Sequence, residues 1–192
     1  VWPCAAGQYQ QSPGSSQCSD CTAGKYNPVT GGATLLACLT CPKGHWCVAG
    51  AKAPSKCAAG SELDARGSKH PSACSACTKG RYHTNEGVAT CMPCPVGTYQ
   101  DAEGQTKCAA CPAGHAQPLL GQASKSACEP CHAGKYQPAA SRGFCVNCGP
   151  GHFEPNTGAV ACEMCATGTF GEAHGAKSAF DGCVDCTAGK YQ

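Results

Sequence analysis

Nine Cys-x-x-Cys pairs recur along the chain, and they constrain its fold more than any other feature. In each pair, the second cysteine is followed three residues later by glycine, usually with an aromatic residue two positions beyond. A short motif repeated this often indicates a tandem array of small modules rather than one globular domain. The 21 cysteines among 192 residues are typical of a scaffold held by disulfides.

The apolar residues are too small to build an ordinary hydrophobic core. Although 42% of the residues are hydrophobic, cysteine supplies 21 of them and isoleucine is absent. Leucine occurs only as Leu35, Leu36, Leu39, Leu63, Leu119 and Leu120. Covalent links must therefore replace core packing, which requires an oxidising compartment. We expect an extracellular, secreted or cell-surface protein.

The charge pattern disfavours nucleic acid and anionic membranes as partners. The chain has 14 Lys and Arg residues against 12 Asp and Glu, without a run of either sign. No stretch approaches the length of a membrane span, and no signal-peptide pattern is present. We expect no membrane segment in this sequence, with export signals and any anchor lying outside it.

The aromatic residues concentrate at one position of the motif, and we expect each to pack on a disulfide. Glycine permits a turn, and the polar-aromatic-polar alternation that follows predicts a very short strand with the ring inward and its neighbours in solvent. Two modules depart, with Glu62 and Ala116 at this position. The packing aromatics are Tyr9, Tyr26, Trp46, Tyr82, Tyr99, Tyr136, Phe153, Phe170 and Tyr191.

A second glycine often precedes the next cysteine, which predicts a hairpin-like return of the chain. The sequence therefore predicts a small, disulfide-rich fold: an elongated tandem array of short β-hairpin-like modules, without a helical core. The sequence divides into N-terminal modules at 1–40, a degenerate region at 41–76, regular modules at 77–182 and the start of a truncated module at 183–192.

One disulfide per module follows when the second cysteine of each pair joins the first cysteine of the next pair. Closing each Cys-x-x-Cys on itself would stabilise little, because so short a loop removes little chain entropy. Cys186 remains unpaired, and we expect the chain to continue beyond it. The frame predicts the pairs Cys4–Cys18, Cys21–Cys38, Cys41–Cys47, Cys57–Cys74, Cys77–Cys91, Cys94–Cys108, Cys111–Cys128, Cys131–Cys145, Cys148–Cys162 and Cys165–Cys183.

The pairing is ambiguous in the degenerate region alone. Cys41–Cys57 with Cys47–Cys74 is the alternative local arrangement. From Cys57 onward, a longer loop recurs at every third module, which predicts a superperiod of three modules.

The motif strings resemble a known family. Cys-Thr-Ala-Gly-Lys-Tyr at 21–26 and 186–191, and Cys-Pro-Val-Gly-Thr-Tyr at 94–99, resemble the ephrin-receptor-like cysteine-rich repeat, which is similar to tumour necrosis factor receptor modules and belongs with the growth-factor-receptor cysteine-rich folds. In these families the two cysteines of a module close one loop, which agrees with the frame above. The resemblance implies that the modules are EGF-like or TNF-receptor-like in fold. It also implies a place in receptors, adhesion proteins or filaments of the flagellar-hair (mastigoneme) type.

Catalysis, metal binding and cofactors are all disfavoured. Paired Cys-x-x-Cys knuckles can bind zinc, but nine knuckles do not pair evenly, and the seven histidines lack ligand spacing. They are His45, His70, His83, His115, His132, His152 and His174. Thiol oxidoreductases use one such motif at a helix start, and no nucleophile elbow is visible. We expect no enzyme, no cofactor and no metal site.

Two function classes remain. The first is a structural rod segment of an extracellular filament, stalk or coat, with self-assembly or lateral packing as the partner interaction. The second is a ligand-binding or adhesion ectodomain of a receptor, for which residues 48–56 beside Trp46 are the candidate surface, although the sequence favours a simple degenerate linker there. No Asn-x-Ser/Thr sequon is present, so any glycans are expected to be O-linked.

Overall fold

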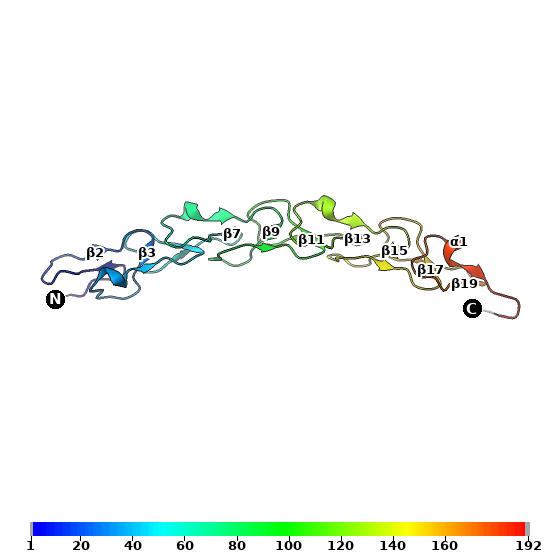
Figure 1. Cartoon of the computed structure of the whole chain (residues 1–192), viewed down its shortest axis with the longest axis horizontal. Helices are drawn as coiled ribbons and strands as arrows, with labels where there is room; N and C mark the ends of the chain where they lie inside the picture. The colour runs from blue at the N-terminus through cyan, green and yellow to red at the C-terminus, as the bar shows by residue number, and fades with distance from the viewer. Residues whose placement is uncertain (1, 191–192) are drawn as a thin grey trace. The chain divides into compact units, whose positions relative to one another are not determined.

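The computed structural model describes residues 2–190 as a succession of two-stranded antiparallel sheets (Figure 1). Each hairpin, with the loop that connects its strands, is one module, and the described residues contain ten, numbered here from the N-terminus. The predicted fold class of short hairpins in a disulfide-rich tandem array is confirmed. The residue after the motif glycine and the aromatic position form the first strands: β1 (Gln8–Tyr9), β3 (Lys25–Tyr26), β5 (His45–Trp46), β7 (Ser61–Glu62), β9 (Arg81–Tyr82), β11 (Thr98–Tyr99), β13 (His115–Ala116), β15 (Lys135–Tyr136), β17 (His152–Phe153) and β19 (Thr169–Phe170).

The second strand of a hairpin is the dipeptide just before the next module's first cysteine. Each such strand therefore lies inside a Cys-x-x-Cys pair, except β6, which precedes Cys57. The second strands are β2 (Ser19–Asp20), β4 (Leu39–Thr40), β6 (Ser55–Lys56), β8 (Ser75–Ala76), β10 (Met92–Pro93), β12 (Ala109–Ala110), β14 (Glu129–Pro130), β16 (Val146–Asn147), β18 (Glu163–Met164) and β20 (Val184–Asp185).

The register is the same from module to module. Tyr26 pairs with Leu39, which follows Cys38, and Tyr136 pairs with Val146, which follows Cys145. In module 3, Trp46 pairs with Ser55 in the same register, but Ser55 follows Pro54 instead of a cysteine. A two-residue strand has too few ladder bonds to be stable alone, so each hairpin depends on its disulfide and on the neighbouring modules.

The longer loops each contain a single helical turn. They are the four loops with a cysteine separation of 17 or 18 residues instead of 14, and the extra residues form that turn. In two of them a serine caps the turn, since the side chains of Ser124 and Ser178 accept a hydrogen bond from a backbone N–H inside it. The turns are η1 (Leu35–Ala37), η2 (Pro71–Ala73), η3 (Lys125–Ala127) and α1 (Ala179–Gly182).

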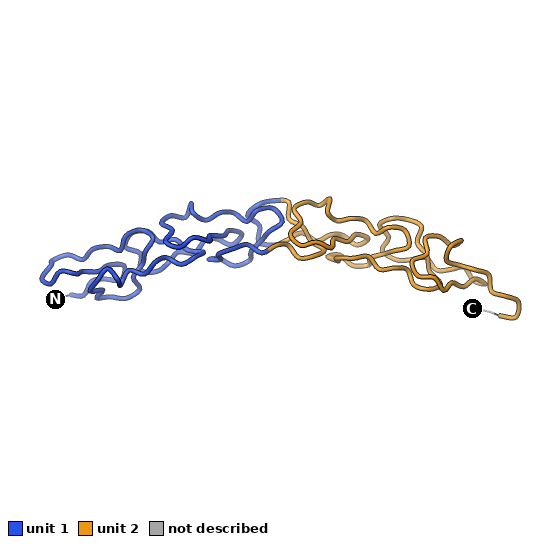
Figure 2. Tube along the Cα trace, viewed as in Figure 1, with its two compact units in different colours: residues 1–92, 102–107 blue, residues 93–101, 108–192 orange. Residues whose placement is uncertain are grey.

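The chain forms two compact units (Figure 2). The first comprises Val1–Met92 and Ala102–Lys107, and the second comprises Pro93–Asp101 and Cys108–Gln192. Within each unit, the buried interior consists mainly of disulfide sulfur and backbone, because the buried hydrophobic residues are nearly all cysteines. This agrees with a composition that offers little else to bury.

Backbone hydrogen bonds join each module to the next within a compact unit. Their geometry repeats, because the same positions of the motif donate and accept at successive junctions. Between modules 2 and 3 the bonds run from Gly24 N–H to Cys47 O (2.8 Å), from Asn27 N–H to Ala51 O (3.0 Å), from Gly50 N–H to Cys21 O (2.8 Å) and from Cys41 N–H to Gly24 O (2.9 Å).

The ring-inward prediction is wrong in one respect. The residue after the aromatic position, rather than the aromatic ring, is the most deeply buried: Asn27 is 0% exposed, whereas Tyr26 is half-buried. The physical reason is the junction itself. Because the N–H and carbonyl groups of this residue bond to the neighbouring modules, its side chain is enclosed by backbone on both sides.

Candidate functional site

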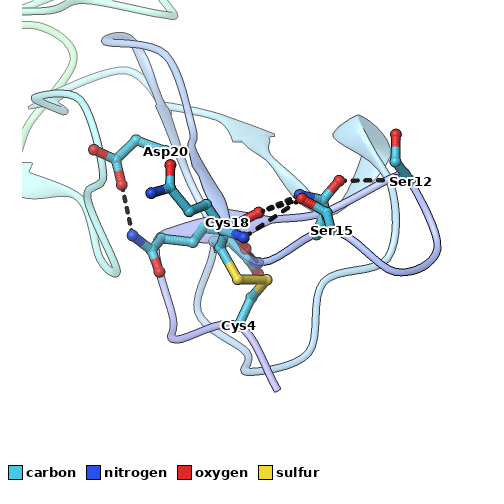
Figure 3. The surroundings of a disulfide bond; sticks show 9 residues. Cys4, Ser12, Ser15, Cys18 and Asp20 are labelled. Atoms are coloured by element: carbon cyan, nitrogen blue, oxygen red, sulfur yellow. Dashed lines mark hydrogen bonds between the residues drawn. A yellow bond between two sulfur atoms is a disulfide. The ribbon is translucent and has the colours of Figure 1, made fainter. Parts of the chain in front are cut away.

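Each described hairpin module contains one disulfide bond, and in every module except module 3 it ends at the cysteine directly before the second strand. Figure 3 shows the first, in which Cys4 joins Cys18 while Gln8 donates to the Asp20 carboxylate across β1 and β2 at 2.9 Å. Cys186 is free. The pairs are those of the sequence-derived frame: Cys4–Cys18, Cys21–Cys38, Cys41–Cys47, Cys57–Cys74, Cys77–Cys91, Cys94–Cys108, Cys111–Cys128, Cys131–Cys145, Cys148–Cys162 and Cys165–Cys183.

Module 3 keeps the hairpin but moves its disulfide. His45 pairs with Lys56 across β5 and β6, in the register that Lys25 and Thr40 have in module 2. By that register, Pro54 stands where a first cysteine would be. Cys41 therefore bonds to Cys47, which directly follows the aromatic position and closes a loop with a sequence separation of only 6.

Eight of the nine predicted packing aromatics lie on first strands, at the cross-strand position described above. Within the described residues they are half-buried, except Phe170, which is 36% exposed and belongs to the last hairpin. Tyr191 lies outside the described residues. Ala116 occupies the same position in module 7 and is only 8% exposed, so this module closes over the missing ring.

A row of buried polar side chains was missed by the sequence reasoning. In module 2, the Asn27 amide donates to the Gln8 carbonyl at 2.9 Å, and its oxygen accepts from Val29 N–H at 3.1 Å. The signal in the sequence is the polar residue that follows most of the aromatic positions, which the polar-aromatic-polar alternation alone places in solvent. The buried members are Asn27, Gln100, Gln117, Gln137 and Glu154.

The departure at Glu62 has its own hydrogen bond. Its carboxylate accepts from Cys91 N–H at 2.5 Å, while the Arg81 guanidinium donates to the Cys91 carbonyl, with Nε at 3.2 Å. The backbone of Cys91 is thus held from both sides by opposite charges. Glu62 therefore replaces an aromatic contact by a polar one between modules 4 and 5.

The surface has shallow hollows but no enclosed cavity with converging chemistry among the described residues. One hollow of about 480 Å³ includes Trp46, Lys56 and Ser61, and another of about 290 Å³ includes His152 and Met164. In residues 2–190 no three His, Cys, Asp or Glu side chains gather as a metal site would require. No helix in that range could cross a membrane.

Three histidines share one motif position and one local contact. Nδ1 of His45, His115 and His152 lies 2.9, 3.3 and 3.0 Å from the carbonyl oxygen two residues earlier. Because a carbonyl only accepts, Nδ1 is the donor in this arrangement. The three lie in different modules, so they do not form a common site.

Each module has one disulfide loop and one hairpin, and a sequence comparison identifies the family to which such modules belong. The profile described as tyrosine-protein kinase ephrin type A/B receptor-like matches residues 80–126, 120–161 and 144–181, more than half of the chain. The chain belongs to this ephrin type A/B receptor-like family. The resemblance seen in the motif strings is thereby confirmed.

The part of the chain before residue 80 carries hairpins and disulfide loops of the same kind. Ten disulfides in receptor-like repeats indicate an extracellular location. A search of curated proteins finds no match to this chain.

Proposed function

We propose that these ephrin-receptor-like modules form a structural segment of an extracellular filament, stalk or cell-surface coat. The observation that carries the proposal is the repeated junction, in which backbone N–H and carbonyl groups of each module form hydrogen bonds with the next module. Such a junction depends little on side chains, so many different sequences can extend it. The array acts as a scaffold, not as an enzyme.

The surface chemistry supports a packing role. The chain is nearly neutral, with a formal net charge of +2, so copies can approach without strong repulsion. Exposed apolar side chains such as Leu36, Phe144 and Phe180 offer contacts to neighbouring protein. Protein partners, including further copies of the chain, are therefore the proposed interaction, and exposed Ser and Thr residues are candidate sites for O-linked glycans.

Ligand binding by a receptor or adhesion ectodomain is the second candidate, favoured by the family match. Its place on this chain is the open hollow of about 480 Å³ that Trp46 and Lys56 line, beside the irregular residues 48–56. An aromatic ring next to a cation is a common feature of protein-recognition surfaces.

Electron microscopy of the unreduced protein from its native source separates the two candidates. Ordered filaments with an axial repeat of several modules support the scaffold. Discrete, unassociated particles at the same concentration contradict it and favour the receptor. Trp46→Ala provides the second arm, since it weakens capture of a ligand only under the receptor proposal.

A further inference from the structure

Between Cys4 and Cys183, residues 48–56 are the longest stretch that no disulfide spans. Between Cys4 and Cys186, successive disulfide loops are otherwise separated only by the two residues inside a Cys-x-x-Cys pair. The exception arises because Cys41 bonds to Cys47, so that nine residues before Cys57 remain outside any loop. In residues 48–56 the modules on the two sides are therefore covalently joined by the backbone alone.

The positions of the basic residues make this segment distinctive. Of the 14 Lys and Arg residues, only Lys52, Lys56 and Lys190 lie outside the disulfide loops, and Lys190 follows the last hairpin. A backbone cut after any other Lys or Arg leaves both sides joined through a disulfide. A cut after Lys52 or Lys56 leaves no covalent link between the two sides.

The local structure exposes the first of these two peptide bonds. Lys52 and Ala53 are exposed and lie in a bend between two anchored segments. On one side, Ala51 O accepts from Asn27 N–H at 3.0 Å, and on the other, Ser55 pairs with Trp46 in β5–β6. No hydrogen bond holds Lys52 or Ala53 within the described part of the chain.

We propose that residues 48–56 form a cleavage site for a lysine-directed, trypsin-like endoprotease, at which the array is divided in two. Water adds to the Lys52 carbonyl carbon and the C–N bond to Ala53 breaks, which leaves a carboxylate on Lys52 and an amine on Ala53. The products are residues 1–52 and 53–192.

The junction contacts keep the cut pieces together until they are loaded or denatured. Across the cut, Cys47 N–H still donates to Ser68 O at 2.9 Å and Gly67 N–H to Cys41 O at 2.8 Å. Cleavage therefore converts a covalent connection into a non-covalent one, which can be separated by force or by a competing module.

Lys69 provides the matched control. Lys52 lies two residues after Gly50, and Lys69 lies two residues after Gly67, the equivalent glycine of module 4. Both lysines are exposed, but Lys69 lies inside the Cys57–Cys74 loop. A cut after Lys69 therefore leaves the two sides joined by the Cys57–Cys74 disulfide, whereas a cut after Lys52 leaves them without a covalent link.

The test is limited digestion of the unreduced full chain with trypsin, followed by denaturing electrophoresis without and with reductant and by mass spectrometry of the new termini. We expect two separate fragments without reductant, with Ala53 as the new N-terminus. Lys52→Gln with Lys56→Gln lowers the rate of this separation by about tenfold or more, whereas Lys69→Gln leaves it unchanged. Unreduced chains that stay whole while the Cys57–Cys74 loop is nicked overturn the proposal, as does a double variant that separates as fast as the parent.

A second variant moves the disulfide itself. Cys47→Asn with Pro54→Cys places cysteines at 41 and 54, the positions that the hairpin register equates with Cys21 and Cys38, whose Cα atoms are 5.6 Å apart. Lys56→Gln is added to this variant, because Lys56 lies outside the new loop. We expect this chain to run as one species without reductant even when Lys52 has been cut. Separation of this variant at the parental rate, with the new disulfide verified by mass, contradicts the proposal.

Discussion

The backbone carbonyl oxygen of Gly67 lies 2.3 Å from the point where a Cβ atom on Gly24 would stand. Gly24 belongs to module 2 and Gly67 to module 4, so the motif glycine contacts the module after next as well as the adjacent one. In the second compact unit, the carbonyl oxygen of Gly158 lies 2.1 Å from the point where a Cβ atom on Gly114 would stand. A module with this contact is therefore held by two successors, a longer reach than the nearest-neighbour coupling usual in linear repeats.

Gly24→Ala is expected to destabilise its compact unit by about 3 kcal/mol, from a left-handed backbone and a steric overlap together. Gly24 has φ +88°, and the added methyl group would overlap a main-chain atom that cannot rotate away. Chemical denaturation of the oxidised protein measures the loss.

Gly14→Ala is the matched control, because Gly14 has φ +78° but nothing within 4 Å of its Cβ position. We expect a loss of only about 1 kcal/mol there, since the backbone penalty acts alone. Equal losses at Gly14 and Gly24 would show that the contact across two modules contributes nothing.

Ser141 occupies the position where the other described modules have a glycine with a left-handed backbone. Its φ is +59°, the only positive value among the non-glycine residues described, and its N–H still donates to the Cys111 carbonyl at 2.9 Å. Ser141→Gly is expected to stabilise the second compact unit by roughly 0.5–1 kcal/mol, because it removes strain at some cost in chain entropy. Thermal unfolding measures it.

The reverse change, Gly158→Ser, tests the same interpretation. Gly158 has φ +78°, and its nearest neighbour, a Pro130 side-chain atom, is 3.8 Å from the Cβ position. Because space is available, we expect a loss of about 1 kcal/mol from backbone strain alone. A neutral Gly158→Ser would imply that Ser141 is not strained.

The buried polar row predicts opposite outcomes for two glutamines. The Gln137 amide donates to the Phe144 carbonyl at 2.7 Å, and its oxygen accepts from Ala139 N–H at 3.2 Å. Gln117 is 1% exposed, and neither of its amide atoms has a partner among residues 2–190. Gln137→Met should therefore cost about 1–3 kcal/mol, whereas Gln117→Met should be neutral or stabilising. Equal losses for the two variants would contradict the distinction.

Tyr99→Ala is expected to loosen mainly the junction of modules 6 and 7. Tyr99 pairs with Ala109 in its own hairpin and forms a parallel bridge with Gln122 of the next module. Because the ring is only half-buried, the loss should be about 1–2 kcal/mol rather than the full cost of a core aromatic. Hydrogen exchange should show faster opening at residues 94–128 than at 148–183, and uniform acceleration would contradict a local effect.

The sequence predicts the hairpins well because the information is local. Cysteine spacing, the glycine turn and the aromatic position all act within about twenty residues, as the register of Tyr26 with Leu39 illustrates. The burial of Asn27 could not be deduced in the same way, because its enclosure depends on the backbone of another module. The helical turn after Ser124 has a signal in the sequence, namely a capping serine before the extra residues. The spacing of the cysteines indicates only that this loop is longer.

The relation between Cys47 and Cys41 shows where local reasoning ends. Loop spacing was compatible with Cys41–Cys47 and with the alternative through Cys57 and Cys74. The hairpin register decides, because it places Pro54 at the vacant first-cysteine position, and Cys47 at the buried position after the aromatic strand.

Loop size leads to a final prediction about this module. The Cys41–Cys47 disulfide closes a separation of 6 residues and Cys57–Cys74 closes 17. In the chain-entropy account the shorter loop contributes about 2 kcal/mol and the longer about 3 kcal/mol. Replacing both cysteines by alanine should therefore cost about 1 kcal/mol less for the Cys41 and Cys47 pair than for the Cys57 and Cys74 pair, as denaturation of each oxidised variant would measure. A larger loss for the short loop would mean that its sulfur atoms stabilise the junction mainly by packing, since Cys41 and Cys47 are both 0% exposed.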